Sequence, residues 1–548
     1  MLSLFDFSLG KSYIFYTWSG TRHNAFHMRR KQSMSDFLLT NAFVITMDPA
    51  CPGARCIAIR DGRVLAVGRD ADLNQFREPG AAVIDCKGKT VVPGFIDGHC
   101  HFLAFAEGLV TLDVRPGDTI RSITDIQTVI RSAARGAPPG AWIRGRGYNE
   151  FYLIEKKHPS RRELDAATSV HPIRLTHRSG RAHLLNSLAL RLVGISAETA
   201  DPPEGLIDRD VETGEPTGLL YGMGGYLAEK IPPLDSAQME RGIRMASRQL
   251  SSLGITSIHD ASPRNGLERW GMFEHWIREG LLQQRVSLML GREGFAAHRM
   301  RAFSSSMGED RLRAGGVKII VHETTGRLSP CREELNEMVS EVHEAGLQAV
   351  LHAIEGRAIV AACDAIEHAL MRSNRSEHRH RIEHCSVCPE PLAERIAALG
   401  IRVVTQPSFI YYNGERYLRT VPRENLKSLY PIATLMKHGI KVSGSSDFPI
   451  VPPDPVKGIY AAVARKAANG AAVLTEECIS AIEALRMYTA SAAEASYEEE
   501  IKGSIKPGML ADLVVLNHDP TRLSADELLN IRPELTIIGG KIVWSQEG

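Results

Sequence analysis

The chain has 548 residues, of which 43% are hydrophobic and 24% charged, a composition typical of globular proteins that excludes disordered and collagen-like chains. Its 65 basic and 64 acidic residues give a formal net charge of +1, so no basic field is available to attract nucleic acid or anionic lipid. No apolar run is long enough to span a bilayer. Nine cysteines scattered along the chain indicate a reducing compartment, and we expect the cytoplasm.

Residues 1–33 differ from the rest of the chain. They contain one acidic residue, Asp6, among five basic ones. Such a composition is typical of an organelle transit peptide, whereas the polar residues that interrupt its apolar run argue against a secretory signal. Alternatively, translation starts at Met34, which opens an ordinary strand. In either case we predict that residues 1–33 are a disordered extension or a mis-assigned start, outside the fold.

Both ends of the remaining chain have the pattern of β-strands. Near the N-terminus, Asp61-Gly62 separates two apolar runs, which is a strong hairpin signal. Near the C-terminus, the runs 512–516, 535–538 and 541–544 are similar. We therefore predict one small β-sandwich composed of residues 34–92 and 498–548.

Between these ends, short apolar runs alternate with helical stretches, which indicates a parallel sheet. Eight such runs predict an α/β fold, a (β/α)8 TIM barrel over residues 93–497. The stretch between the first and second strands is too long for a loop, so we predict an inserted subdomain at about 110–250 that covers the barrel mouth. The predicted strands are 91–96, 255–259, 285–290, 317–321, 349–352, 381–384, 403–406 and 441–444.

Polar residues occur at the ends of these strands, where barrel enzymes place their active sites. His99 and His101 follow the first strand at the spacing that puts both on one side. A lone His-x-His is a weak pattern. However, Lys318, His352, His384 and Asp447 occupy the ends of four further strands, and a lysine inside a barrel strand is costly unless it is neutralised. Convergence of six such residues predicts a metal site.

Several segments resemble the amidohydrolase superfamily. Its strand-1 metal motif is similar to residues 93–101 (PGFIDGHCH), and its C-terminal sandwich signature is similar to residues 503–516 (GSIKPGMLADLVVL). The predicted insertion narrows the resemblance to amidohydrolase family 3, the branch similar to N-substituted formamide deformylases. The matching segments there are 142–147 (WIRGRG), 158–165 (HPSRRELD) and 175–180 (LTHRSG).

This resemblance implies a set of metal ligands. His99 and His101 would bind the more buried metal ion with Asp447 beside it, and His352 and His384 would hold a second one. Lys318 would bridge both ions as a carbamate, which converts a costly buried cation into an anionic ligand. One or two divalent ions are expected; zinc suits these ligands best, although manganese, iron or nickel is compatible with them.

The chain departs from the family pattern at two positions. Where relatives often have Asp-Gly after the bridging lysine, this chain has a segment that includes His322, which lies at even spacing from Lys318 and is expected to point into the same mouth. Arg181 stands where relatives often carry histidine after Ser-Gly. These departures bear on the number of metal ions and on substrate contacts.

The expected activity is metal-dependent hydrolysis of a non-peptide C–N bond in an amide, an N-formyl compound or a cyclic amide. A metal-activated hydroxide attacks the carbonyl carbon while Asp447 shuttles the proton. His177 is either an oxyanion donor or a surface histidine of the insertion, and His259 either supports the metal ligands or is a polar residue of the core.

Two alternatives remain at this stage: a mononuclear deaminase, or a non-catalytic barrel that serves as an interaction protein. We expect a small-molecule substrate, no nucleic-acid or membrane partner and, from base rates alone, a homodimer.

Overall fold

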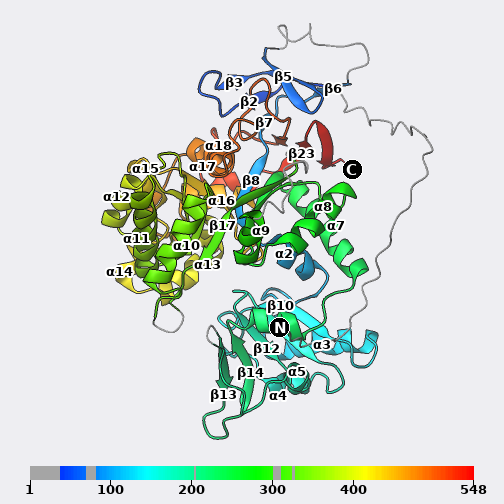
Figure 1. Cartoon of the computed structure of the whole chain (residues 1–548). Helices are drawn as coiled ribbons and strands as arrows, with labels where there is room; N and C mark the ends of the chain where they lie inside the picture. The colour runs from blue at the N-terminus through cyan, green and yellow to red at the C-terminus, as the bar shows by residue number, and fades with distance from the viewer. Residues whose placement is uncertain (1–36, 70–81, 203–204, 300–309, 324–326, 548) are drawn as a thin grey trace, which may run out of the picture.

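The computed structural model describes residues 37–69, 82–202, 205–299, 310–323 and 327–547 (Figure 1). The predicted extension, residues 1–33, lies outside the described residues. A central barrel sheet lies between two sheets formed by residues 37–93 and 513–545 and a third sheet formed by the insertion (Figure 1).

Eight parallel strands form the central sheet in the order β21-β20-β19-β18-β17-β16-β15-β8, which confirms the (β/α)8 barrel. The end of β8 bonds the segment that follows β21, because the amide of Asp447 donates to the carbonyl of His99 at 2.9 Å and that of His101 to the carbonyl of Phe448 at 2.8 Å. The strands are β8 (Phe95–Cys100), β15 (Ile255–Asp260), β16 (Arg285–Leu290), β17 (Leu312–Ile320), β18 (Ala349–Ala353), β19 (Arg381–His384), β20 (Arg402–Thr405) and β21 (Val442–Gly444).

The first predicted strand, residues 91–96, is wrong as a single element. It is divided between β7 (Thr90–Pro93) of a terminal sheet and β8 of the barrel. The division falls at Gly94, where a Cβ atom would lie 2.2 Å from Oγ1 of Thr256. Both strands are buried on both faces, so the apolar run continues across the break and hides it.

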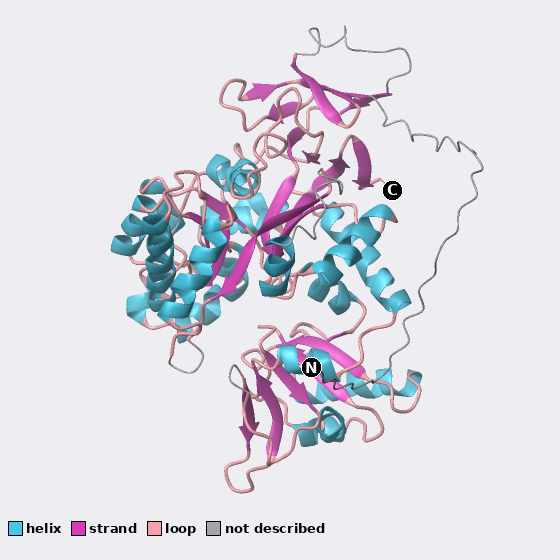
Figure 2. Cartoon of the chain, in the orientation of Figure 1, coloured by secondary structure: helices cyan, strands magenta, loops and turns pink. Residues whose placement is uncertain are grey.

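Helices surround the barrel strands (Figure 2). Those of the barrel are α2 (Phe102–Leu109), α7 (Ser236–Ser252), α8 (Leu267–Arg278), α9 (Arg292–Arg299), α10 (Arg332–Glu344), α11 (Gly356–Arg372), α12 (Glu390–Ala398), α13 (Ser408–Thr420), α14 (Arg423–Leu426), α15 (Ile432–Lys437), α16 (Pro455–Ala464), η2 (Thr475–Glu477), α17 (Ala481–Met487) and α18 (Ala490–Glu494). Within the described part of the chain, no helix has the length and apolar character needed to cross a membrane.

The two ends of the chain form a β-sandwich. One apolar cluster contains Leu39 and Ile57 from the first sheet together with Val91 and Val515 from the second, so the two sheets share a core. The first sheet has the order β5-β4-β1-β6 and the second β24-β23-β22-β7-β2-β3. Beyond β7, their elements are β1 (Phe37–Thr40), β2 (Phe43–Ile45), β3 (Gly53–Ala54), β4 (Cys56–Arg60), β5 (Arg63–Gly68), β6 (Ala82–Asp85), β22 (Leu513–Leu516), η3 (Asp526–Asn530), β23 (Pro533–Ile538) and β24 (Lys541–Ser545).

The insertion after β8 has a six-stranded sheet of its own, in the order β13-β14-β12-β11-β10-β9. The last helix before β15, α7, packs against α2 of the barrel. We propose that the chain is divided into a sandwich domain (34–92 plus 498–548) and a barrel domain (93–497), with the inserted subdomain at about 110–250. The elements of the insertion are β9 (Leu112–Asp113), α3 (Ile123–Gly136), β10 (Ile143–Tyr148), α4 (Arg161–Asp165), β11 (Ile173–His177), β12 (Ala182–Leu185), α5 (Ser187–Val193), β13 (Leu206–Arg209), β14 (Pro216–Tyr221) and α6 (Gly224–Lys230).

Candidate metal centre

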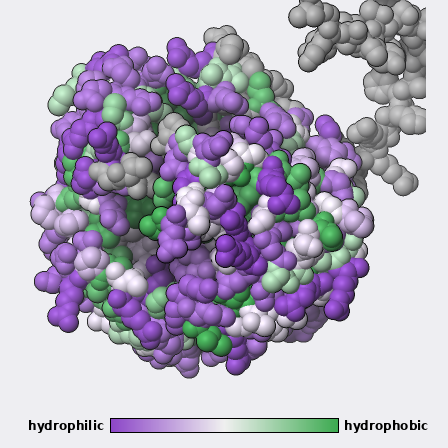
Figure 3. All heavy atoms as spheres, turned by 90° about the horizontal axis from the view of Figure 1, so that it is seen from below, coloured by the Kyte–Doolittle hydropathy of each residue, from purple (hydrophilic) through white to green (hydrophobic). Residues whose placement is uncertain are grey.

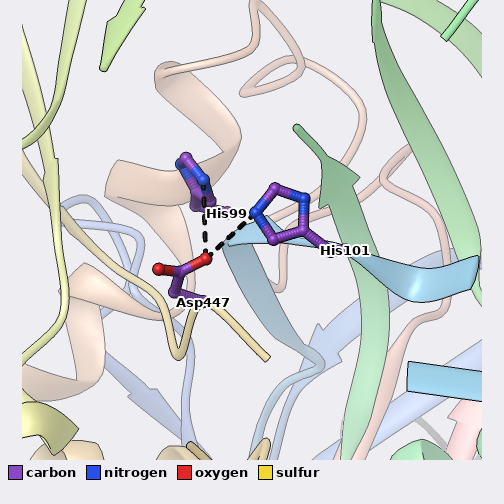
Figure 4. Close-up of side chains that lie close together, drawn as sticks. All are labelled: His99, His101 and Asp447. Atoms are coloured by element: carbon purple, nitrogen blue, oxygen red, sulfur yellow. Dashed lines mark ion pairs between the residues drawn. The ribbon is translucent and has the colours of Figure 1, made fainter. Parts of the chain in front are cut away.

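His99, His101 and Asp447 meet where β8 and β21 end at the barrel mouth (Figure 4). Oδ1 of Asp447 lies 3.2 Å from Nε2 of His101 and 3.7 Å from Nε2 of His99. The His99 side chain is buried, whereas 26% of the His101 side chain is exposed. Two imidazoles and a carboxylate, with ligand atoms within 4.8 Å of one another, form a donor set suited to a divalent metal ion.

The remaining predicted ligands lie around this group. Nζ of Lys318 on β17 is 3.4 Å from Nε2 of His99. The His384 ring centroid lies 4.9 Å from that of His99 and 4.4 Å from that of His352. Nδ1 of His384 is also 4.0 Å from Oδ2 of Asp447. The structure therefore brings all six strand-end residues together.

Hydrogen bonds at Nδ1 orient three of the histidines. Each has Nδ1 engaged by a neighbouring side chain, which leaves Nε2 available as the metal-binding atom. The partners are Glu383 for His99, Ser262 at 3.2 Å for His101 and Gln406 at 2.9 Å for His384. Nε2 of His384 and Oδ1 of Asp447 are buried and have no hydrogen-bond partner among the described residues. Such unpartnered buried acceptors fit a bound cation.

Burial sets the protonation states. It lowers the pKa of His99 well below the usual value, assisted by the charge of Lys318, and it acts likewise on the pKa of His352, beside His384. It also lowers the pKa of Lys318 to about 8. Burial alone would raise the pKa of Asp447, but the adjacent side chains of His101, His99 and His384 bring it to about 2. Neutral imidazoles and an ionised carboxylate are the forms that bind metal.

A left-handed backbone at His384 turns this side chain toward the mouth. Side chains alternate along β19, and Arg381 and Glu383 point into the barrel interior, where they contact Gly98 and His99. Regular alternation would direct His384 away from it. Instead, its φ of +72°, which is rare for a non-glycine residue, allows two consecutive residues to serve the same site.

Arg381 and Glu383 are functional candidates that the sequence analysis missed. Nε of Arg381 donates to Oε1 of Glu383 at 2.8 Å, and its Nη2 donates to the carbonyl of Gly98 at 2.8 Å. Both side chains are buried beneath His99. The signal in the sequence was their spacing of two residues on a short predicted strand, which directs both charges to the same side. Charged groups are usually buried only as pairs.

Three other predicted residues make contacts outside the ligand set. His259 on β15 has Nδ1 3.5 Å from Arg381 and Nε2 3.8 Å from Glu498, so it is a core residue below the centre. His177 on β11 pairs with Glu150 at 2.8 Å. His322 exchanges backbone hydrogen bonds with Ser329, and its contribution to the mouth stays a prediction.

Arg181 and the turn before it lie near the mouth. The charge of Arg181 contributes to lowering the pKa of His352. In the same turn, a Cβ atom on Gly180 would lie 3.5 Å from Cδ1 of Ile450, three residues after Asp447. The turn after β11 thus approaches the barrel mouth from the insertion.

Fold and site together define a metal-dependent hydrolase with a (β/α)8 barrel. Residues 82–544 match the model of the amidohydrolase family, and the chain belongs to that family. It is therefore an enzyme that acts on carbon–nitrogen bonds, and the alternative of a non-catalytic barrel is set aside.

Individual relatives cover almost the whole chain. It is 30% identical over 550 residues to an N-substituted formamide deformylase of Arthrobacter pascens, covering 94% of this chain and 99% of that protein. Among solved structures, a metal-dependent hydrolase of Pyrococcus furiosus is 26% identical with a TM-score of 0.70, covering 89% of this chain and 100% of that one. One from Pyrococcus horikoshii is 24% identical with a TM-score of 0.72, covering 90% and 99%.

Proposed function

We propose that the enzyme hydrolyses a non-peptide C–N bond in a small molecule, such as an N-formyl amine, another amide or a cyclic amide. The observation that carries this proposal is the ionised Asp447 held between histidine Nε2 atoms at the barrel mouth. The similarity to an N-substituted formamide deformylase favours an N-formyl substrate.

The residues that would hold metal are His99, His101 and Asp447 for one ion and His352 and His384 for a second. Lys318 would bridge the two ions as a carbamate, because its buried amine is easier to deprotonate than an exposed one. A divalent ion, zinc by preference, would lower the pKa of a bound water toward about 7 and polarise the substrate carbonyl.

The proton steps belong to Asp447. Its carboxylate accepts a proton from the attacking water as the new C–O bond forms at the carbonyl carbon. It then returns that proton to the nitrogen as the C–N bond breaks. Burial of Asp447 and His99 keeps this exchange away from bulk solvent. His177 is the proposed donor to the carbonyl oxygen, once the substrate displaces it from Glu150.

Metal content per chain tests this proposal. We expect about two ions per wild-type chain when the protein is purified without chelator and with bicarbonate present, and fewer in Lys318→Ala. Lys437→Ala, at an exposed lysine, is the matched control and should keep wild-type content. N-formyl amines and other amides are then screened for hydrolysis.

The outcomes separate the candidate activities. About one ion, unaffected by Lys318→Ala, together with ammonia release from aminated rings, would favour the mononuclear deaminase. Absence of bound metal after supplementation would overturn the hydrolytic mechanism proposed here.

Three further assignments accompany this proposal. The substrate is a small molecule, the enzyme is a homodimer and the compartment is the reducing cytoplasm. The nine cysteines, all of which are free thiols in the structure, support the last of these.

A further inference from the structure

A cleft of about 880 Å³ separates the insertion from the barrel, a volume suited to a small organic ligand. One wall of the cleft adjoins the candidate metal site. Phe105, one helical turn after His101, lines it, as does Ile450, whose amide donates to the carbonyl of Asp447 at 2.9 Å. The opposite wall comes from the insertion. Seen from below, the surface of the molecule is mostly hydrophilic and is hollowed (Figure 3).

Arginine dominates the charged residues of this cleft. Arg115, Arg121, Arg146 and Arg178 line it, and Asp113 is the one carboxylate among its described lining residues. Asp113 is already taken, because Nε of Arg115 donates to its Oδ1 at 2.9 Å. The cleft therefore keeps a strong excess of positive charge, which attracts anions.

Two of these arginines form no ion pair among the described residues. Among the described residues, no carboxylate lies within ion-pair distance of Arg146 or Arg178, whereas Arg121 has Asp118 at 3.6 Å. Both unpartnered side chains are half-buried. Burial lowers the pKa of Arg178 and the neighbouring charge of Arg416 lowers it further, whereas the more weakly acting charge of Glu150 raises it. Like charges held together in a partly buried place are costly unless an anion joins them.

An unused donor lies beside Arg178. Nη1 of Arg178 donates to Oδ1 of Asn413 at 3.0 Å, which fixes the orientation of the Asn413 amide. Asn413 is 5% exposed and also lines the cleft, yet its Nδ2 has no hydrogen-bond partner in the described part of the chain. A buried donor left without an acceptor is unfavourable, so the amide and the guanidinium together present donors for an anionic ligand.

We propose that the substrate carries a carboxylate away from the scissile bond, and that Arg178 and Asn413 bind this carboxylate while the C–N bond lies beside Asp447. This inference rests on the proposed hydrolysis of a C–N bond. The apolar side chains of Phe105 and Ile450 would contact the part of the substrate between its two ends. A planar carboxylate suits a guanidinium, which can donate two parallel hydrogen bonds to it.

Two isosteric probes test the inference: 4-(formamidomethyl)benzoate, which is anionic, and 4-(formamidomethyl)benzamide, which is neutral. We expect the metal-loaded enzyme to hydrolyse the anionic probe with kcat/KM about tenfold to a hundredfold higher. Arg178→Met should remove most of this preference and Arg178→Lys should retain part of it. Arg135→Met, the same charge change at an exposed position outside the cleft, should keep the wild-type ratio.

Calorimetric binding of both probes separates this inference from the proposed function. Equal hydrolysis of the two probes by wild type, or an unchanged ratio in Arg178→Met, would overturn the carboxylate site and leave the hydrolase intact. If neither probe is hydrolysed, tighter binding of the benzoate that depends on Arg178 still supports the site. Equal binding of the two probes in that case refutes it.

Discussion

The carboxylate of Glu383 connects a predicted metal ligand to the interior of the barrel. It accepts from Nδ1 of His99 and forms a buried ion pair with Arg381. A carboxylate in this position fixes the ring orientation and makes Nε2 a better ligand. Arg381 in turn holds Glu383 in place and bonds the carbonyl of Gly98, the residue before His99. We therefore infer that Glu383 is a positioning residue for the candidate metal centre.

Replacing this carboxylate by an amide tests its role. We expect Glu383→Gln to weaken metal affinity about tenfold to a hundredfold, because the amide polarises His99 less strongly. Affinity is measured by competition with a chromophoric chelator, and circular dichroism verifies that the variant is folded. Glu377→Gln, at a side chain that is 73% exposed near the same strand, serves as the control. Wild-type affinity in folded Glu383→Gln would reduce Glu383 to a structural role.

At the level of single residues, the sequence predicted the candidate metal ligands better than the residues that orient them. His99, His101 and Asp447 could be found because barrel strands place their last residues at one mouth. Glu383 was not predicted, since alternation makes it face the opposite way from the neighbouring His384. The left-handed φ of His384 brings both to the site, and that conformation depends on tertiary packing that no local pattern encodes.

At the scale of elements, the barrel closes through small residues. A Cβ atom on Gly98 of β8 would lie 3.1 Å from the carbonyl oxygen of Gly444 on β21. A Cβ atom on Gly444 would lie 2.6 Å from the ring of Tyr488, whose side chain is fully buried. Close approach of these two strands places Asp447 beside His99, so glycine at this junction serves the geometry of the site.

Enlarging this junction should destabilise the protein. We expect Gly444→Ala to cost about 1–3 kcal/mol by overpacking against Tyr488, with a lower apparent Tm and weaker metal binding. Gly136→Ala is the control, because a Cβ atom at this position, the end of α3, would have no described neighbour within 4 Å. That variant should match or slightly exceed wild-type stability. A wild-type melting curve for Gly444→Ala would contradict this account of barrel closure.

Element boundaries were less predictable than element types. The eight barrel runs have the short apolar character of buried parallel strands, and seven of them overlap single observed strands of the barrel. The run 91–96 does not, because a chain that passes from one buried sheet directly into another keeps its hydrophobicity. Only Pro93 and Gly94 mark that transition.

At the scale of the whole molecule, a buried ion pair joins the barrel to the terminal sandwich. Nε of Arg285 on β16 donates to Oδ2 of Asp512 at 2.5 Å, and Nη2 donates to Oδ1 at 2.9 Å. The amide of Gly539 also donates to Asp512, at 2.8 Å. Burial alone would raise the pKa of Asp512, but the charge of Arg285 and these hydrogen bonds hold it below the usual value. The ionised form is thus favoured by folding.

Loss of the Asp512 carboxylate should weaken the attachment of the terminal sandwich to the barrel. Asp512→Asn leaves Arg285 buried without a counter-charge, and we expect a cost of about 3–5 kcal/mol at pH 7. Because the folded pKa is depressed, the wild-type contribution is complete above the unfolded pKa of about 3.9 and is lost as pH falls through the lower folded value. The difference in apparent Tm between wild type and variant should therefore stay constant from pH 7 to 5 and narrow below pH 4.

Asp526→Asn, which removes an exposed pair with Lys466, is the control and should change stability by less than about 1 kcal/mol. A similarly small effect for Asp512→Asn would show that apolar packing alone joins the two parts.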